Sequence, residues 1–411
     1  MTGQLTLGPG TWAEGWPPTR DSALTRVARV RPAEYARTRN HLDGAVTGLS
    51  PYLTHGLITL REVLAGVLNR EPMAVQHRFV FELGWREFFR HVWTHEDERI
   101  LSSVHEGPRP DAAYALALPS DIREARTGVP VIDEAVRTLY TSGMLHNHAR
   151  MWLASYVVHL RHVHWRAGAD WLVAHLLDGD LGSNHLNWQW VAGTGSHKPY
   201  LFNAETVARY APPAQHSGGT AIDTDYETLD RIARGGPLPG AEPAASSSRI
   251  AATAEPALSS LEESTTATRS PAPGAALFAG RDVWLVQPWS LREAPADLPA
   301  GALHIGLWLD DFHRQWPWSA ARWHFASARM AALTSAQYRG DANTWRQALA
   351  SARSVQGWSD PHLGDAFDGF DLPTPTPLFV EPGMCCGSFS QFWNRATRGV
   401  VQASELLAAG R

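Results

Sequence analysis

The segment from Asp178 to Trp190 concentrates residue types that can hold a polar ring. It reads Asp-Gly-Asp-Leu-Gly-Ser-Asn-His-Leu-Asn-Trp-Gln-Trp, so acids, amides and two tryptophans fall within thirteen residues. Acids and amides can pair with the N–H and C=O groups of a planar heterocycle, and Trp can stack on it or donate an electron. The alternative interpretation is structural: a helix N-cap followed by a buried aromatic pair.

Helical spacing dominates the chain before residue 212. Between residues 76 and 95, one helical face collects Glu82, Trp85, Arg86, Phe89 and Trp93. Three more helices are predicted at 131–142, 146–164 and 167–177, the first with Pro130 near its start and Gly143 after its end. Since no convincing strand pattern precedes residue 212, we predict a mainly α region.

Three sequence blocks together resemble the FAD-binding domain of photolyases and cryptochromes. They run from Glu82 to His91 (ELGWREFFRH), from Leu145 to Met151 (LHNHARM) and from Asp178 to Trp190. Their content, order and spacing agree with that family. The resemblance implies a helical domain at 31–211 that binds FAD, preceded by an N-terminal extension at 1–30.

The resemblance implies two sets of cofactor-binding residues. One set resembles the residues that hold the FAD phosphates, although Val46 stands where the family usually has Thr; for Arg86 an ion pair with Glu82 is the alternative. The other set surrounds the flavin ring, where the neutral amide of Asn184 faces N5 and favours full reduction. The predicted residues are Tyr35, Thr47, Gly48, Leu49, Ser50 and Arg86, then Arg150, Asp178, Asp180 and Asn184.

A substrate pocket is implied in the same way. In the family, a cyclobutane pyrimidine dimer flips out of the DNA, receives an electron from excited FADH⁻, splits and returns the electron; flipping is needed because a stacked base is out of reach. The lining residues carried over are Glu82, Trp85, Asn147, Met151 and Trp190. The predicted catalytic residues are Glu82, Asn184 and the electron-transfer tryptophans Trp188 and Trp165.

Several positions depart from the family pattern. The distal tryptophan position falls near Ala112, with Tyr114 as the nearest aromatic residue. His148 replaces an arginine that usually contacts a DNA phosphate. Residues 1–211 hold 21 basic and 21 acidic side chains. Each lost phosphate contact weakens DNA affinity, so we expect weaker binding of dimer-containing DNA than is usual for the family. The alternative function is a cryptochrome-like blue-light photoreceptor or redox flavoprotein without repair activity, with an unidentified signalling partner.

The remainder of the chain divides by composition. Residues 212–280 are rich in Ala, Pro, Ser, Gly and Thr and are predicted to form a flexible linker. Residues 281–411 carry short β-type runs at 283–286 and 303–309 and a helix at 319–333, which predicts a small α/β domain. Because photolyases begin with an α/β antenna domain, this region is either a circularly permuted, reduced antenna-type domain or an unrelated appended domain.

Composition excludes several classes of protein. The formal charge is −5, and Cys385 and Cys386 are the only cysteines, which excludes a disulfide framework, a Cys-rich zinc site and a four-cysteine iron–sulfur cluster. The histidines near residue 160 lack carboxylates at ligand spacing, so no metal is predicted. The longest apolar run, 151–158, is too short to span a membrane, and we expect a cytoplasmic protein.

Overall fold

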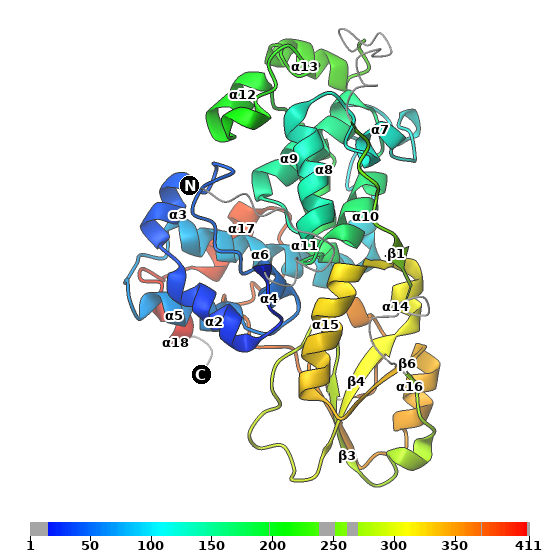
Figure 1. The fold of residues 1–411 in the computed structure, drawn as a ribbon. Helices are drawn as coiled ribbons and strands as arrows, with labels where there is room; N and C mark the ends of the chain where they lie inside the picture. The colour runs from blue at the N-terminus through cyan, green and yellow to red at the C-terminus, as the bar shows by residue number, and fades with distance from the viewer. Residues whose placement is uncertain (1–14, 197, 238–250, 261–269, 371, 409–411) are drawn as a thin grey trace. The chain divides into compact units, whose positions relative to one another are not determined.

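The computed structural model describes residues 15–196, 198–237, 251–260, 270–370 and 372–408 (Figure 1). The chain divides into two compact units. Unit 1 comprises residues 1–30, 47–88 and 257–411, and unit 2 comprises residues 31–46 and 89–256. Helix α6 (Arg78–Glu96) passes from the first unit into the second. The predicted helical region at 31–211 is therefore shared between two units.

Unit 2 is helical. Besides the end of α6 it contains α3 (Pro32–Thr38), α7 (Ser120–Arg123), α8 (Pro130–Ser142), α9 (Asn147–Ser155), a π-helical turn (Tyr156–Leu160), α10 (Trp165–His175), α11 (Leu181–Ala192), α12 (Ala204–Tyr210) and α13 (Tyr226–Ala233), with short 3₁₀ turns at 97–101, 111–113 and 213–215. Its core lies among α8, α9, α10 and α11 and includes the fully buried Trp152 and Leu153.

Local signals explain where these helices begin and end. Pro130 begins α8, and Gly143 ends it with φ = 67°, a left-handed conformation that glycine adopts at little cost. The helix predicted at 146–164 was too long. It ends as the π-helical turn closes at Leu160, and His162 has φ = 49°, which an α-helix does not allow.

Unit 1 combines helices with a parallel sheet. Its helices are α2 (Arg20–Arg29), α4 (Ser50–Thr54), α5 (Leu60–Leu68), the start of α6, α14 (Asp310–Gln315), α15 (Ala320–Leu333), α16 (Ala342–Leu349), α17 (Phe389–Ala396) and α18 (Glu405–Ala408), with 3₁₀ turns at 275–277 and 361–363. Its strands are β1 (Leu258–Ser259), β2 (Ser270–Pro271), β3 (Asp282–Val286), β4 (Leu303–Leu309), β5 (Trp318–Ser319), β6 (Ala336–Gly340) and β7 (Ser354–Gln356).

The sheet has the order β2-β6-β4-β3-β7, and every neighbouring pair is parallel. Helices α15 and α16 flank it in Figure 1. The order steps outward from β3 through β4 to β6 and then changes direction to β7, as in doubly wound folds. The predicted small α/β region is thus confirmed, and so is the mainly α fold class, although strand β2 of the sheet lies before the predicted boundary at residue 281. Circular permutation stays a prediction.

The predicted extension and linker contain more structure than their composition suggested. In the extension, Val27 of α2 packs against Gly66 of α5 within unit 1. In the linker, Leu229 and Ile232 of α13 are buried in unit 2. Further on, the Glu255 carboxylate accepts hydrogen bonds from Trp171, His175 and Arg123, each 3.0 Å long. Residues 238–250 and 261–269 of the predicted linker lie outside the described residues.

None of the helices in the described part of the chain is long and apolar enough to cross a lipid bilayer.

Candidate functional site

A cavity in unit 2 brings together the four residues predicted around the flavin ring and three that were predicted for substrate binding or electron transfer. Its walls come from α9, the end of α10, the turn before α11 and α11 itself. The predicted residues among them are Asn147, Arg150, Met151, Asp178, Asp180, Asn184 and Trp188. The enclosed volume is about 60 Å³, so unit 2 alone encloses room for one edge of a ring system rather than a whole dinucleotide.

An ion pair fixes the polar end of this cavity. Arg150 Nη2 lies 2.9 Å from both carboxylate oxygens of Asp178, whose side chain is only 2% exposed. Arg150 Nε also donates to the Leu145 carbonyl oxygen at 3.0 Å. A buried carboxylate is stable as an anion only when it is paired in this way. The pair predicted beside the flavin ring is therefore present.

Asp180 and Asn184 are held by backbone groups. The Asp180 carboxylate accepts from the Ser183 N–H at 2.7 Å and caps α11. Asp180 is therefore both a helix N-cap and a residue of the cavity wall. The Asn184 amide nitrogen donates to the Ala169 carbonyl oxygen at 2.9 Å. Because a carbonyl only accepts, this contact fixes which end of the amide is nitrogen.

Trp188 lies in a close contact between α10 and α11. A Cβ on Gly168 would lie 2.3 Å from Trp188 Cη2, so only glycine permits this approach. Trp188 and Trp165 are each 2% exposed, and Trp165 Nε1 donates to Ser103 Oγ at 2.9 Å. Both predicted electron-transfer tryptophans are therefore buried, but only Trp188 lines the cavity.

A chain of rings continues from Trp165 towards Tyr114. The His164 ring lies 5.7 Å from Trp165, and the Tyr114 ring lies 6.2 Å from His164 at a near-perpendicular angle. Tyr114 is partly buried, which raises its pKa. Ala112, the counted distal position, is exposed and carries no ring.

Two of the predicted substrate contacts, Asn147 and Met151, line the cavity. Asn147 is exposed at the start of α9, and its Nδ2 lies 3.4 Å from Met151 Sδ. Trp190 is not among the cavity residues. It is 38% exposed, and its ring lies 5.5 Å from Tyr200. The structural alternative, a buried aromatic pair, is therefore wrong for Trp190. This residue points away from the buried Trp188 side of α11, because residues two positions apart on a helix lie on different faces.

The predicted phosphate turn, Thr47 to Ser50, lies in unit 1 and ends at the start of α4. Gly48 has φ = 62°, and a Cβ there would lie 2.7 Å from Arg26 Nη1. The Gly48 carbonyl accepts from Trp16 Nε1 at 3.1 Å, and the Leu49 N–H donates to Thr47 Oγ1 at 3.3 Å. The guanidinium of Arg26 therefore lies beside this turn. Tyr35 is half-buried on α3 in unit 2.

Arg86 and Glu82 lie on the first half of α6. Arg86 Nη2 donates to Thr54 Oγ1 at 2.7 Å, which ties α6 to the end of α4. Glu82 lies 3.7 Å from Arg78 Nη1. Arg86 and Glu82 therefore place a guanidinium and a carboxylate on neighbouring turns of α6.

Trp85, the predicted apolar wall, is stacked against a segment that the sequence did not connect to it. The ring centroids of Trp85 and Phe389 are 4.0 Å apart, and the planes are 7° from parallel. Both residues belong to unit 1.

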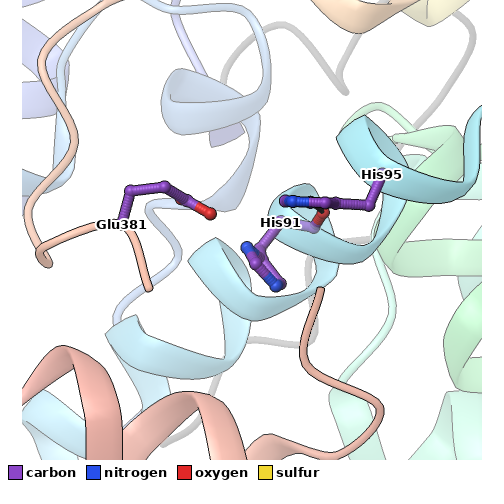
Figure 2. Close-up of side chains that lie close together, drawn as sticks. All are labelled: His91, His95 and Glu381. Carbon is purple, nitrogen blue, oxygen red and sulfur yellow. Dashed lines mark hydrogen bonds between the residues drawn. The ribbon is translucent and has the colours of Figure 1, made fainter. Parts of the chain in front are cut away.

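His91 and His95 occupy successive turns in the second half of α6 (Figure 2). Their ring centroids are 4.3 Å apart, and His95 Nδ1 lies 2.8 Å from the His91 carbonyl oxygen. Glu381, the third residue drawn, belongs to unit 1.

Three histidines of unit 2 are uncharged at neutral pH. Burial lowers the pKa of His146, His148 and His159 to about 4. His146 Nδ1 accepts from the His148 N–H at 3.1 Å, which requires an unprotonated nitrogen. His148, which the resemblance places where the family usually has an arginine, thus carries no positive charge at pH 7.

Sequence reasoning missed several residues beside the predicted ones. Ser183 and Asn187 line the cavity from α11, and helical spacing from Asp180 and Asn184 could have found them. Arg26 and Phe389 come from other parts of the chain, and no local pattern indicates them.

The residues present suit a flavin ring. The cavity offers a fixed cation–carboxylate pair, an oriented amide and a buried indole, which are donors and acceptors for a planar ring with polar edges. The turn at Thr47 to Ser50 offers hydroxyl and N–H groups beside an arginine, which suit a pyrophosphate.

Comparisons with known proteins agree with this chemistry. Residues 79–226 match the family described as the FAD-binding domain of DNA photolyase. The chain is 34% identical over 194 residues to a deoxyribodipyrimidine photo-lyase of Streptomyces griseus, covering 46% of this chain and 41% of that protein. It is 31% identical over 209 residues to cryptochrome-1 of Arabidopsis thaliana, covering 47% of this chain and 30% of that protein.

A solved cryptochrome of Synechocystis sp. PCC6803 is 26% identical, with a TM-score of 0.42, and the match covers 47% of this chain and 43% of that one. The chain spans less than half the length of the two curated relatives named above. The motifs, the cavity and the family match agree. The chain is therefore similar to photolyases and cryptochromes, and residues 79–226 match the FAD-binding domain of DNA photolyase.

Proposed function

We propose that the protein is a light-driven, FAD-dependent lyase that repairs cyclobutane pyrimidine dimers in DNA. The observation that carries the proposal is the cavity of unit 2, where seven of the residues carried over from the family line one space. Bound FAD would supply the excited-state electron donor. The chain's own residues bind and orient the ring and the lesion.

The roles that we propose for the chain's residues combine their observed contacts with the resemblance to the family. Asp178 holds Arg150 at the polar edge of the cavity, and Ala169 holds the neutral amide of Asn184. A neutral amide cannot protonate N5 as an acid can, which favours a fully reduced ring. Trp188 and Trp165, both buried, would carry electrons towards a bound flavin during photoactivation. On the substrate side, Glu82 and Asn147 bond base edges, while Trp85, Met151 and Trp190 supply apolar contacts.

We also propose that the protein binds DNA more weakly than related photolyases. His148 is neutral at pH 7, and the region before residue 212 has no net charge. Fewer cationic contacts release fewer counterions, so the salt dependence of binding is shallow.

The second candidate is a cryptochrome-like photoreceptor or redox flavoprotein without repair activity. The same neutral His148 favours it, since a photoreceptor need not hold DNA. This candidate is tested by searching for a partner protein that binds the chain in light and not in darkness.

The deciding experiment is blue-light repair of an oligonucleotide with one thymine dimer by chemically reduced, FAD-loaded protein. Chemical reduction bypasses the altered tryptophan chain. We expect light-dependent loss of the dimer that is strongly reduced in Glu82→Gln and retained in Glu71→Gln, a control at an exposed glutamate. Absence of repair by fully reduced wild-type protein overturns the repair proposal.

A further inference from the structure

The exposed side of Trp85 is determined by α17. Phe389 is 5% exposed and covers one face of the indole at 4.0 Å. Phe88 meets the indole edge-on at 5.7 Å. Trp85 is nevertheless only half-buried, so part of the ring stays accessible.

Helix α17 packs along one face of α6. Phe389 contacts Phe81 at 4.6 Å, and Trp393 lies over Gly84, where a Cβ would come within 2.7 Å of the indole ring. Residues 81, 84, 85 and 88 follow helical spacing, so this face is a continuous strip. Trp393 Nε1 also donates to Gln76 Oε1 at 3.3 Å.

Backbone contacts fasten the C-terminal segment on both sides of α17. Before the helix, the Glu87 carboxylate accepts from the Leu378 N–H at 2.6 Å and the Phe379 N–H at 2.9 Å. After it, the Val75 N–H donates to the Val401 carbonyl at 2.9 Å, and the Ala403 N–H donates to the Met73 carbonyl at 3.0 Å. Phe389 is therefore held firmly against Trp85.

We propose that Phe389 is a positioning residue for lesion binding, which holds the Trp85 ring so that its accessible side receives a flipped pyrimidine. The inference rests on the proposed role of Trp85. A ring that is already oriented loses less conformational freedom when a base stacks on it, so the stack favours binding of the flipped dimer. Phe389, which lies outside the matched residues 79–226, thus orients Trp85, whose proposed role is carried over from the family.

The first test measures Trp85 without DNA. In protein labelled with 5-fluorotryptophan, the ¹⁹F resonance of Trp85 is identified by its loss in Trp85→Phe. We expect Phe389→Leu, which keeps an apolar side chain, to shift and broaden this resonance, and Phe389→Tyr to preserve it. Phe392→Leu is the matched control, because Phe392 is buried on α17 and contacts Phe88 at 5.8 Å. An unchanged resonance in Phe389→Leu overturns the proposal.

The second test measures the preference of FAD-loaded protein for dimer-containing over undamaged oligonucleotide. We expect Phe389→Leu to lower this preference about three- to tenfold, with Phe389→Tyr and Phe392→Leu close to wild type. An unchanged or increased preference in Phe389→Leu contradicts positioning and indicates that Phe389 occupies the place of the base. If wild-type protein has no preference, the proposed function and the lesion role fail together, while the ¹⁹F result still decides whether Phe389 holds Trp85.

Discussion

The cavity of unit 2 and the Trp85 surface of unit 1 are assembled in different ways. Every residue that lines the cavity lies between Asn147 and Val191, on successive helices joined by short turns. The Trp85 surface joins residues 81–88 to residues 378–403, which are far away in the chain. A site built from neighbouring helices shows a periodic pattern in the sequence, whereas a site built from distant segments does not.

The largest effect should come from breaking the ion pair of the cavity. Asp178→Ala leaves the Arg150 guanidinium without its buried partner, which should lower the free energy of unfolding by about 3 kcal/mol and abolish FAD retention. Urea unfolding and bound flavin absorbance measure both effects. Glu205→Ala, which breaks the exposed pair with Arg209, should cost less than about 0.5 kcal/mol. Equal losses in the two variants would show that the cavity pair has no special role.

Acidification should destabilise unit 2 next most strongly. The pKa values of His146, His148 and His159 lie at about 4 in the folded protein, against 6.5 ordinarily. Between these values the unfolded chain binds protons that the folded chain does not, so stability is complete above pH 6.5 and falls as the pH drops. From pH 7 to pH 5 we expect a loss of about 1 to 2 kcal/mol for each histidine.

Urea unfolding at several pH values tests this prediction. His159→Gln should make the pH dependence shallower, whatever its effect on stability at pH 7. A slope identical to that of the wild type would mean that this histidine does not contribute.

The smallest effect concerns the fastening of the C-terminal segment in unit 1. Glu87→Gln removes the charge that accepts two backbone N–H groups, which should weaken the segment by about 1 kcal/mol. Trypsin should then cut at the exposed Arg395 and Arg398 about fivefold faster. Glu71→Gln serves as the control, and equal cleavage rates in both variants would contradict this role of Glu87.

The sequence predicted the cavity better than its surroundings. Asp180, Asn184 and Trp188 follow one another at intervals of four residues, so their gathering on one side of α11 follows from local geometry. The position of Phe389 depends on how a distant helix packs, and a single sequence carries no periodic signal for that. Glu255 was missed for a different reason: its low-complexity surroundings concealed a carboxylate that accepts from the buried Trp171 and His175 and from the exposed Arg123.

The return of α17 to α6 has a consequence for synthesis on the ribosome. About 300 residues separate Trp85 from Phe389, which corresponds to about 15 to 60 s of translation. During that interval the helices of unit 2 can emerge and pack, whereas the strip of Phe81, Trp85 and Phe88 has no α17 to cover it. The nascent chain therefore presents an aromatic surface late into its synthesis, and chaperones that bind apolar segments should find it there.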